Sequence, residues 1–239
     1  MRIALLGYGK MGKAIESLIE KEQEDEVVLT IDSQNIYELT TNALKHADVA
    51  IEFSTPQSAI SNIDMCFDAG IPIVVGTTGW YDQLDKVKKR CTEKNGALVY
   101  ASNFSIGVNV LFALNKKLAE LMAPEKSYLP SITEVHHLQK KDSPSGTGIT
   151  LANDILLYNK DRKKWVNTYT EKKDELPVIS IREDDVKGIH EVQYISSVDV
   201  ITLRHEAFSR DGFALGSIKA AHWVVGKKGC FEFKDVLGL

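Results

Sequence analysis

The sequence is poor in cysteine and has no long hydrophobic run. Its three cysteines, Cys66, Cys91 and Cys230, lie far apart and form no Cys-x-x-Cys pair. A sparse, odd count argues against a disulfide framework or a cysteine metal site and is typical of a reducing compartment. The apolar stretches are far shorter than the ~20 residues that span a bilayer, and residues 1–7 lack the features of a signal peptide. We therefore expect a cytoplasmic protein with no membrane among its partners.

An excess of positive charge is also absent. Lys and Arg number 29 against 33 Asp and Glu, which gives a net charge of −4, whereas nucleic-acid-binding domains usually present a basic face. We expect no nucleic-acid partner. With 44% hydrophobic and 26% charged residues, the composition is that of a globular protein and not of a disordered chain. A chain of 239 residues suffices for one large domain or two modest ones.

Short apolar runs alternate with helix-length segments over the first hundred residues. The runs contain no polar alternation and lie at residues 3–6, 27–31, 49–53, 71–75 and 97–100. Helix-length segments lie between them, for example at residues 57–69 and 81–94. Strands without alternation that are separated by helices are typical of a parallel sheet covered on both faces. The sequence therefore predicts an α/β fold.

The middle of the chain has a mixed α and β pattern. Helices are predicted at residues 108–122 and 147–158, with a strand at 131–137 between them. Residues 191–195 and 199–207 alternate polar with apolar side chains, which predicts an antiparallel hairpin whose open face is solvated or pairs with another subunit. The apolar stripe of the first helix consists of Val110, Leu111, Leu114, Leu118 and Leu121, and that of the second of Leu151, Ile155 and Leu156.

The last third of the chain combines a charged segment with a return to alternating elements. Residues 160–175 are dense in Lys, Asp and Glu, which predicts an exposed excursion. The final thirty residues predict a helix at 214–225 and a short strand at 230–233.

A glycine-rich turn follows the first predicted strand and opens the first predicted helix. Gly7, Gly9 and Gly12 form the pattern Gly-x-Gly-x-x-Gly, and Asp32 stands twenty residues after Gly12. In dinucleotide-binding sheets the first glycine makes the tight turn, the second admits the pyrophosphate, and the third lets the helix pack on the strand. The helix start attracts the phosphates, and Asp32 can accept from a ribose hydroxyl of NAD. A plain strand–helix turn without a nucleotide is the alternative.

We therefore interpret residues 1–105, completed by residues 210–239, as a Rossmann-type dinucleotide-binding domain. Residues 106–209 form an inserted α+β domain for substrate binding and oligomerisation. Lys10 follows the second glycine and could meet a 2′-phosphate, which Asp32 would repel. We expect NADH to be used, with NADPH as the alternative, and a solvated Lys10 as the other interpretation of that lysine.

Two further strand ends carry small polar residues. Ser54 follows the third predicted strand, and Gly76, Thr77 and Thr78 follow the fourth. Ligands of open parallel sheets sit at the carboxyl ends of the strands. We expect these four residues to reach the nicotinamide and its ribose; ordinary turn chemistry is the alternative.

The segment from residue 134 to residue 147 combines histidine, lysine and a helix start. If His136 and His137 end a strand, their side chains point to opposite faces and have different tasks. Ser145-Gly146-Thr147 opens the next predicted helix, where hydroxyl and N–H groups bind anions. Lys140 adds a mobile positive charge. This combination predicts a pocket for a small acidic substrate beside a histidine proton donor.

Two other interpretations of this segment are open. Glu134 and His136 share a face of the predicted strand, so a metal site is one alternative. Lys140 and the anion-binding turn suit a carboxylate better, and we expect no metal. Either histidine could instead be a structural residue.

The same segment resembles the family of 4-hydroxy-tetrahydrodipicolinate reductases, also called dihydrodipicolinate reductases, of lysine and diaminopimelate biosynthesis. The family pattern Glu-x-His-His-x-x-Lys-x-Asp-Ala-Pro-Ser-Gly-Thr is matched from Glu134 to Thr147, with Ser143 in place of the alanine. The resemblance runs through the whole chain. Further landmarks are Met11-Gly12, Gly76 to Gly79, Ala101 to Asn109, Gly188 with His190, Ser209-Arg210 with Phe213 and Gly216, and Asp235 to Leu237.

The resemblance implies a reduction of 4-hydroxy-tetrahydrodipicolinate to tetrahydrodipicolinate by NADH or NADPH, with hydride added at C4 and water lost. It implies that His136 is the general acid and that Lys140 assists it and binds the substrate. It also implies a homotetramer. The two substrate carboxylates would be held by His137, Ser145, Gly146, Thr147 and Arg210. Further cofactor contacts are implied at Met11, Ala101, Asn103 and Phe104.

Two departures from the family pattern lie at the adenosine end of the cofactor. The glycine turn is one residue shorter than the usual Gly-x-x-Gly-x-x-Gly, and the segment between Asp32 and Val49 is short. Both concern the choice between NADH and NADPH. Rival interpretations are another two-domain reductase of small acids or sugars, a semialdehyde dehydrogenase, which would need a positioned cysteine, and a non-catalytic NADH-sensing module, which would need an output surface. A purely oligomerising middle domain is a further alternative.

Overall fold

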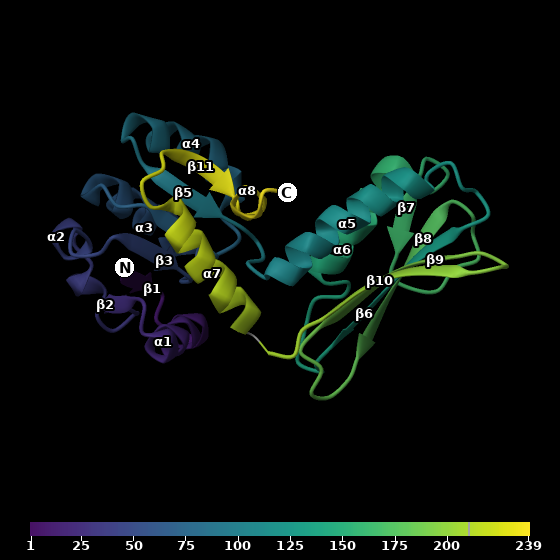
Figure 1. The fold of residues 1–239 in the computed structure, drawn as a ribbon, viewed down its shortest axis with the longest axis horizontal. Helices are drawn as coiled ribbons and strands as arrows, with labels where there is room; N and C mark the ends of the chain where they lie inside the picture. The colour runs from purple at the N-terminus through teal and green to yellow at the C-terminus, as the bar shows by residue number, and fades with distance from the viewer. Residues whose placement is uncertain (210) are drawn as a thin grey trace. The chain divides into compact units, whose positions relative to one another are not determined.

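A computed structural model describes residues 1–209 and 211–239 of the chain. It divides into two compact units, shown in Figure 1. Unit 1 comprises Met1–Ile106 and Asp211–Leu239, and unit 2 comprises Gly107–Arg210. Among the described residues, every helix is too short or too polar to span a lipid bilayer.

Unit 1 contains a six-stranded parallel sheet in the order β11-β5-β4-β3-β1-β2. The chain runs outward from β1 to β2 and then crosses to the other side of β1 for β3, so the direction of winding reverses between β1 and β3. Ligands of such sheets bind outside the carboxyl ends of the strands at this reversal. The strands are β1 (Arg2–Leu6), β2 (Glu26–Ile31), β3 (Val49–Glu52), β4 (Ile73–Val75), β5 (Ala97–Tyr100) and β11 (Gly229–Glu232).

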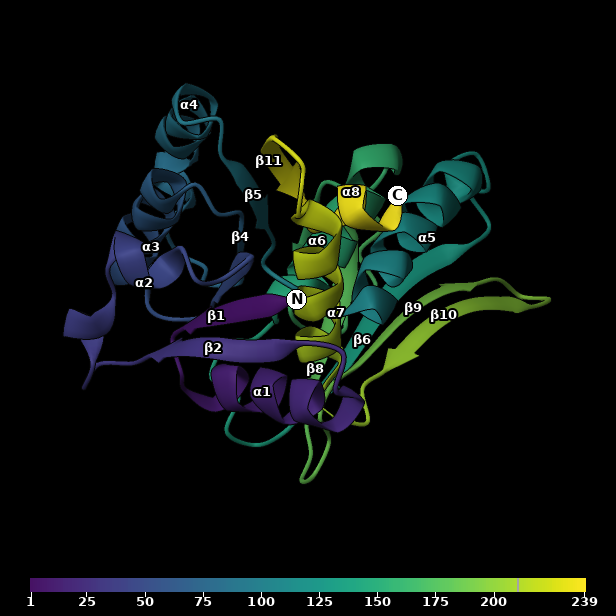
Figure 2. The same cartoon turned by 60° about the vertical axis from the view of Figure 1, so that its left-hand side comes forward.

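Helices cover both faces of this sheet, which explains why its strands lack polar alternation. Helices α3 (Pro56–Ala69) and α4 (Leu84–Glu93) share one apolar core with the strands, and α1 (Lys10–Glu22) and α7 (Asp211–Val224) share another on the opposite face (Figure 2). The remaining short elements are η1 (Ile36–Glu38), α2 (Thr41–Leu44), η2 (Tyr81–Gln83) and α8 (Phe233–Leu237). The predicted Rossmann-type sheet is confirmed.

Unit 2 contains a five-stranded mixed sheet in the order β10-β9-β6-β8-β7. Strand β6 is parallel to β8 and antiparallel to β9, and β9 and β10 form the predicted hairpin. The elements are α5 (Ile106–Met122, whose first residue belongs to unit 1), β6 (Leu129–His136), α6 (Gly146–Tyr158), β7 (Lys164–Val166), β8 (Glu175–Arg182), β9 (Ile189–Ile195) and β10 (Val200–Glu206).

Helices α5 and α6 pack on one face of the unit 2 sheet. Leu111, Leu151 and Ile155 of the helices share a buried core with Ile132 of β6. After the exposed Leu129, strand β6 alternates buried and half-buried side chains. Because side chains repeat at every second position of a strand, Glu134 and His136 lie on the same covered face as Ile132. Two polar residues therefore enter the buried side of this sheet.

The apolar stripe predicted for α5 lies on a helix, but most of it is exposed within the chain. Leu111 is buried, but Val110, Leu114 and Leu121 are 39%, 51% and 59% exposed. The buried face carries Asn115, whose side-chain amide donates to the Leu151 carbonyl at 3.1 Å, together with Val108, Leu111, Ala119 and Met122. Helical periodicity identified the most apolar face of α5. The face that packs on the sheet instead contains Asn115, which is hydrogen-bonded, and smaller side chains.

The segment from residue 160 to residue 175 is only partly an exposed excursion. Residues Lys164–Val166 form β7 and pair in parallel with the start of β8. Glu175 is 6% exposed and receives the Lys164 and Lys172 side chains. Most of the segment is exposed as predicted, but the predicted excursion also contains a strand and a buried, ion-paired Glu175.

A close backbone approach holds α7 against the chain after β5. A Cβ atom added at Gly216 would overlap the carbonyl oxygen of Phe104, whereas one added at Gly212 would lie 3.8 Å from its nearest neighbour. Gly216→Ala must therefore shift α7 or the Phe104 backbone, while Gly212→Ala needs no movement.

We expect Gly216→Ala to lower the free energy of unfolding by about 1–3 kcal/mol, the usual cost of overpacking. Gly212→Ala, the matched control in the same helix, should change it by less than about 1 kcal/mol, in the stabilising direction. Denaturant unfolding followed by tryptophan fluorescence measures both. Equal loss in the two variants would show that the close approach is not what requires glycine.

Candidate active site

The glycine turn of unit 1 leaves the start of α1 open. Gly7 has a φ of +96°, and a Cβ atom there would overlap the Phe53 carbonyl; a Cβ atom at Gly12 would lie 2.8 Å from the Gly7 oxygen. Both glycines are therefore required by packing. Gly9 differs, because a Cβ atom there would have nothing within 4 Å. Gly9 caps α1 without a side-chain hydrogen bond, and the first turn holds no acidic residue.

Asp32 is fixed at the end of β2 by its own loop. The Asp32 N–H donates to the side chain of Asn35 at 2.8 Å, and the Gln34 N–H donates to the Asp32 carboxylate at 2.7 Å. Lys10 is exposed and Met11 half-buried in the first turn of α1. An open helix start with no acid of its own suits a pyrophosphate, and a fixed carboxylate suits a ribose diol. These residues fit a nicotinamide dinucleotide.

A buried carboxylate lies behind the strand ends at β3 and β4. Glu52 is fully buried, and its pKa is raised by burial, with hydrogen bonds from neighbouring groups opposing the change. The Ser54 N–H donates to it at 2.9 Å and the Ser54 hydroxyl also hydrogen-bonds to it. Asn62 donates to the Ser54 hydroxyl at 3.3 Å. Sequence reasoning named Ser54 and missed Glu52 and Asn62, which orient it.

The other predicted cofactor residues of unit 1 have varied surroundings. Thr77 is buried, and its carbonyl accepts from the Trp80 indole at 2.7 Å, while Thr78 is exposed. Asn103 accepts from the Ser105 N–H at 2.8 Å. The Phe104 side chain is 1% exposed and belongs to the core. Gly76 lies against the Phe53 ring, which a Cβ atom would overlap, and Ala101 is half-buried. Their contacts with a cofactor stay predictions.

Strand register assembles the polar cluster of unit 2. Glu134 lies opposite His190 of β9 in the antiparallel pairing and opposite Ser180 of β8 in the parallel pairing. His136, two residues further along β6, lies opposite Arg182. Residues far apart in the sequence therefore meet at one end of the sheet, on the face that the helices cover.

Glu134 is the centre of this cluster. It is fully buried and accepts the Ser145 N–H at 2.8 Å, the Ser145 hydroxyl, and the Ser180 hydroxyl at 2.9 Å. The guanidinium of Arg182 lies 3.9 Å from the same carboxylate. A Cβ atom at Gly148 would lie 2.6 Å from it, so glycine is needed in the first turn of α6. A carboxylate of the protein itself thus occupies part of the predicted anion-binding turn.

This geometry changes the interpretation of Ser145. Its N–H and hydroxyl are directed to Glu134, and its hydroxyl oxygen accepts the Gly148 N–H at 3.1 Å as the cap of α6. Gly146 is exposed and Thr147 half-buried at the same helix start. The predicted contact of Ser145 with a substrate carboxylate stays a prediction, as do those of Gly146 and Thr147.

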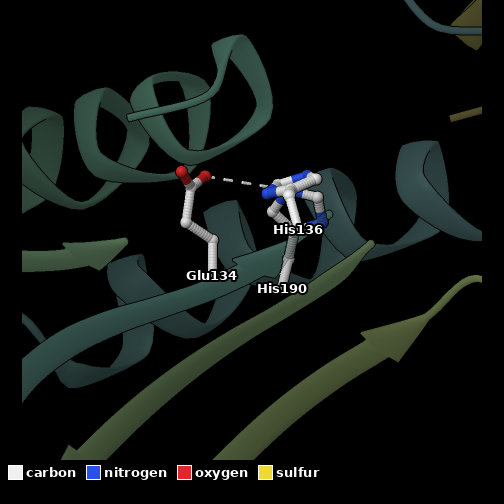
Figure 3. Close-up of side chains that lie close together, drawn as sticks. All are labelled: Glu134, His136 and His190. Atoms are coloured by element: carbon white, nitrogen blue, oxygen red, sulfur yellow. Dashed lines mark ion pairs between the residues drawn. The ribbon is translucent and has the colours of Figure 1, made fainter. Parts of the chain in front are cut away.

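Two buried imidazoles lie beside the Glu134 carboxylate, as Figure 3 shows. The rings of His136 and His190 are 4.9 Å apart and meet edge to face. Burial lowers the pKa of His136; Glu134 opposes this change, and the positive charges of Lys140 and Arg182 add to it. Burial also lowers the pKa of His190, to about 4, so His190 is neutral at physiological pH.

His137 and Lys140 lie in the loop that follows β6. His137 comes directly after the strand end and is half-buried. Its carbonyl accepts the Lys140 N–H at 3.1 Å. The Lys140 ammonium lies 2.9 Å from Asp142. The structure therefore brings His136 and Lys140 to the same end of unit 2. Arg210, also predicted to bind substrate, lies outside the described residues.

The cluster also has the residue types of a metal site. Ligand atoms of Glu134, His136 and His190 lie within 4.8 Å of one another. Both oxygens of Glu134, however, already accept hydrogen bonds from Ser145, and the Arg182 guanidinium lies 3.9 Å away. A second cation would have to displace these donors and tolerate like charge. We interpret the three residues as a hydrogen-bonding and packing network, not as ligands.

The fold and this cluster together define a class. A Rossmann-type sheet with an open dinucleotide turn, in one chain with an α+β unit that carries a buried histidine beside a lysine, is the organisation of a two-unit NAD(P)-dependent oxidoreductase.

The comparison with known families is more specific. Residues 1–104 match the model of the dihydrodipicolinate reductase N-terminus, and residues 107–237 match that of the dihydrodipicolinate reductase C-terminus. The chain belongs to the dihydrodipicolinate reductase family.

Individual relatives agree with this assignment over nearly the whole chain. The chain is 48% identical over 237 residues to the 4-hydroxy-tetrahydrodipicolinate reductase of Christiangramia forsetii, covering 99% of this chain and 98% of the relative. It is 34% identical over 244 residues to that of Rickettsia rickettsii, with the same coverage. A dipicolinate-bound dihydrodipicolinate reductase from Paenisporosarcina sp. TG-14 has the same fold, with a TM-score of 0.77, 23% identity and 97% of each chain covered.

The burial of neutral His190 predicts a loss of stability in acid. In the unfolded chain the imidazole takes up a proton near its ordinary pKa of 6.5, whereas in the folded protein it does so only near 4. The folded state is therefore destabilised as pH falls from 6.5 to 4, by on the order of 3 kcal/mol from this group.

His190→Gln should remove this part of the pH dependence, so that the variant loses less stability than the unaltered protein between pH 7 and pH 4.5. The free energy of unfolding is measured at each pH by denaturant titration, with hydrogen exchange of peptides from β6 and β9 as the signal for unfolding of unit 2. The exposed His46→Gln serves as the control and should follow the unaltered protein. Parallel curves for His190→Gln and the unaltered protein would contradict the neutral buried imidazole.

Proposed function

We propose that the protein reduces 4-hydroxy-tetrahydrodipicolinate to tetrahydrodipicolinate with NADH or NADPH, a step of diaminopimelate and lysine biosynthesis. The observation that carries this proposal is the pairing of family membership over the whole chain with a buried His136 and a nearby Lys140 at the end of β6. The dipicolinate bound to the Paenisporosarcina relative is a planar analogue of such a substrate and supports a dicarboxylate as the ligand.

Unit 1 holds the cofactor in this proposal. The start of α1 and the open space at Gly9 receive the pyrophosphate, and Asp32 accepts from the adenosine ribose. Ser54, held by Glu52, offers its hydroxyl oxygen as an acceptor near the strand ends. Bound NADH or NADPH would supply a hydride for C4 of the substrate ring.

Unit 2 supplies the proton and holds the substrate. The imidazolium of His136 would donate a proton to the ring carbon next to C4, so that the added hydride and proton balance the loss of one water from the substrate. Lys140 assists this transfer and, with His137, Gly146 and Thr147, contributes to binding the two carboxylates; Ser145 and Arg210 have the same proposed role.

Charge in this site explains when His136 becomes protonated. Without substrate, burial and the nearby positive charges of Lys140 and Arg182 lower its pKa below 6.5. A bound dicarboxylate brings two negative charges, which favour the imidazolium. The substrate thus promotes protonation of the acid that acts on it.

We also propose a cytoplasmic homotetramer, as in the family resemblance. Apolar side chains on the unit 2 sheet support association, because Leu129, Ile195 and Val200 are 56%, 44% and 53% exposed on strands that neighbour one another.

The direct test is a coupled assay. Aspartate semialdehyde and pyruvate are combined with the preceding synthase to generate the substrate, and oxidation of NADH and of NADPH is followed separately. Oxidation that depends on the synthase supports the proposal. Cofactor binding without substrate-dependent oxidation would instead favour a non-catalytic NADH-sensing module.

Asp32 and Lys10 provide opposite predictions for cofactor choice. NADH should be used at least as efficiently as NADPH. Asp32→Ala should weaken NADH binding by about tenfold, the loss of a hydrogen bond to a charged group, and NADPH binding by less. Lys10→Ala, the matched control, should weaken NADPH more than NADH. Fluorescence titration measures both. A strict NADPH preference in the unaltered protein would overturn this assignment.

The neighbouring histidines should separate in steady-state kinetics. His136→Gln should lower kcat by ~10²–10⁴-fold, the usual contribution of general acid catalysis, with NADH affinity unchanged. His137→Gln should mainly raise KM, and Lys140→Ala should impair both parameters. In the unaltered protein, kcat/KM should fall as pH rises through a pKa below 6.5, whereas kcat should fall at higher pH, because bound carboxylates raise the pKa of His136.

Two results would contradict these roles. A normal kcat for His136→Gln together with a low kcat for His137→Gln would exchange the two histidines. A pH dependence of kcat that coincides with that of kcat/KM would show that the substrate does not promote protonation of His136.

A further inference from the structure

The loop from residue 137 to residue 145 carries three of the proposed active-site side chains, those of His137, Lys140 and Ser145, but has little structure of its own. It connects β6 to α6. The Lys140 N–H donates to the His137 carbonyl at 3.1 Å, and the Lys140 ammonium pairs with Asp142 within the loop. Neither contact ties the middle of the loop to the sheet. Only the end of the loop is held, because Ser145 donates to Glu134 on β6 and the Ser143 hydroxyl accepts from Asn167 at 2.8 Å. Something outside the loop has to set the position of Lys140 relative to His136.

Arg182 at the end of β8 reaches this loop with its guanidinium. Its Nη2 donates to the Asp142 carbonyl at 2.6 Å, and its Nε lies 3.4 Å from the Lys140 carbonyl. Its Nη1 donates to the Ile181 carbonyl at 2.9 Å and lies 3.9 Å from the Glu134 carboxylate. One planar group therefore contacts β6, β8 and the loop, and its side chain is only 20% exposed.

We propose that Arg182 is a positioning residue for the reaction: its guanidinium joins the buried Glu134 carboxylate to the backbone of the Lys140 loop and so holds the Lys140 ammonium beside His136. This inference rests on the proposed function of Lys140 and His136. Arg182 acts through Lys140, because its nitrogen atoms are directed to carbonyl oxygens and to Glu134.

Lysine could not replace arginine in this position. The contacts lie in several directions from one rigid plane, which a guanidinium presents and a single ammonium does not. The carbonyl oxygens of Lys140 and Asp142 lie on one side of the group and Glu134 on another. A lysine would keep the charge near Glu134 and lose the link to the loop, so the two contributions of Arg182 can be separated by substitution.

The charge of Arg182 has its own measurable effect at His136. The charged and titratable groups around that imidazole are Glu134 on β6, Lys140 and Asp142 on the loop, Arg182 on β8 and His190 on β9. Arg182 and Lys140 both lower the pKa of His136. Removing the charge of Arg182 therefore raises that pKa directly, whereas removing only its geometry raises it less, through the displacement of the Lys140 ammonium.

The experiment compares Arg182→Lys and Arg182→Met in steady-state kinetics. Both variants should lose ~10- to 100-fold in kcat/KM, as expected when a reacting group is displaced. In Arg182→Met the fall of kcat/KM with pH should move to higher pH, and in Arg182→Lys, which keeps the charge near Glu134, it should move less. Arg162→Met is the matched control, because Arg162 also donates to backbone carbonyls in unit 2, those of Lys172 and Glu175, away from this loop; its kcat/KM should change by less than ~2-fold.

A double-mutant cycle with Lys140→Ala tests whether Arg182 acts through Lys140. If it does, Arg182→Lys should cost much less in a chain that already carries Lys140→Ala. Hydrogen exchange of residues 138–142 should increase in Arg182→Met and stay unchanged in Arg162→Met. NADH affinity, measured by fluorescence titration, should be normal in all variants and reports that unit 1 is folded.

The outcomes separate a failure of the proposed function from a failure of the positioning role of Arg182. If the unaltered protein does not oxidise cofactor in the coupled assay, the proposed function fails, and hydrogen exchange still decides whether Arg182 holds the loop. Suppose instead that the unaltered protein is active. The positioning role is then overturned if the losses in kcat/KM caused by Arg182→Lys and Lys140→Ala multiply in the double variant, or if Arg182→Met keeps the kcat/KM of the unaltered protein.

Discussion

The buried carboxylate of Glu134 is the constraint on which the active-site end of unit 2 depends. A carboxylate removed from water is strongly destabilising unless donors and opposite charge surround it. Ser145 at the start of α6 and Ser180 on β8 supply hydrogen bonds, and Arg182 supplies the charge. His190, its cross-strand neighbour, adds no charge because its pKa is about 4. The contacts of this one carboxylate thus hold the start of α6 against β6, β8 and β9. They also fix the end of β6, where His136 lies two residues after Glu134.

In unit 1, close backbone contacts at glycine residues fix the positions of the helices. Gly7 and Gly12 allow α1 to lie directly against the strand ends, and Gly216 allows α7 to lie against the chain after β5. A side chain at any of these positions would overlap a backbone oxygen or come within 2.8 Å of one. Gly9 has no such neighbour, so its lack of a side chain is not needed for packing. The open space beside Gly9, at the uncapped start of α1, is therefore available to a ligand.

Local sequence patterns predicted the elements of the site better than its connections. The parallel sheet, the glycine turn and the Gly146–Tyr158 helix follow from apolar periodicity and helix-start residues, which are local properties. The strand Glu175–Arg182 was missed, because Pro177 and Ser180 interrupt its apolar run. With that strand missing, Arg182 could not be placed, and the pairing of Glu134 with His190 depends on a register between residues 56 positions apart in the chain. The buried face of α5 could not be predicted for a related reason: Asn115 is buried because Leu151 accepts from it, and that partner lies on another helix.

In the proposed mechanism, the charges that would attract the substrate also lower the pKa of its proposed acid, His136, before the substrate binds. Lys140 and Arg182 place positive charge near the pocket, which favours a dicarboxylate but lowers the pKa of His136. An imidazole that stayed protonated in the absence of substrate would add to the repulsion among these groups within a buried cluster. A bound dicarboxylate would offset the charge of Lys140 and Arg182 and so raise the pKa of His136. In this mechanism substrate binding and protonation of His136 would both follow from one electrostatic balance, to which Glu134 contributes through its contact with Arg182.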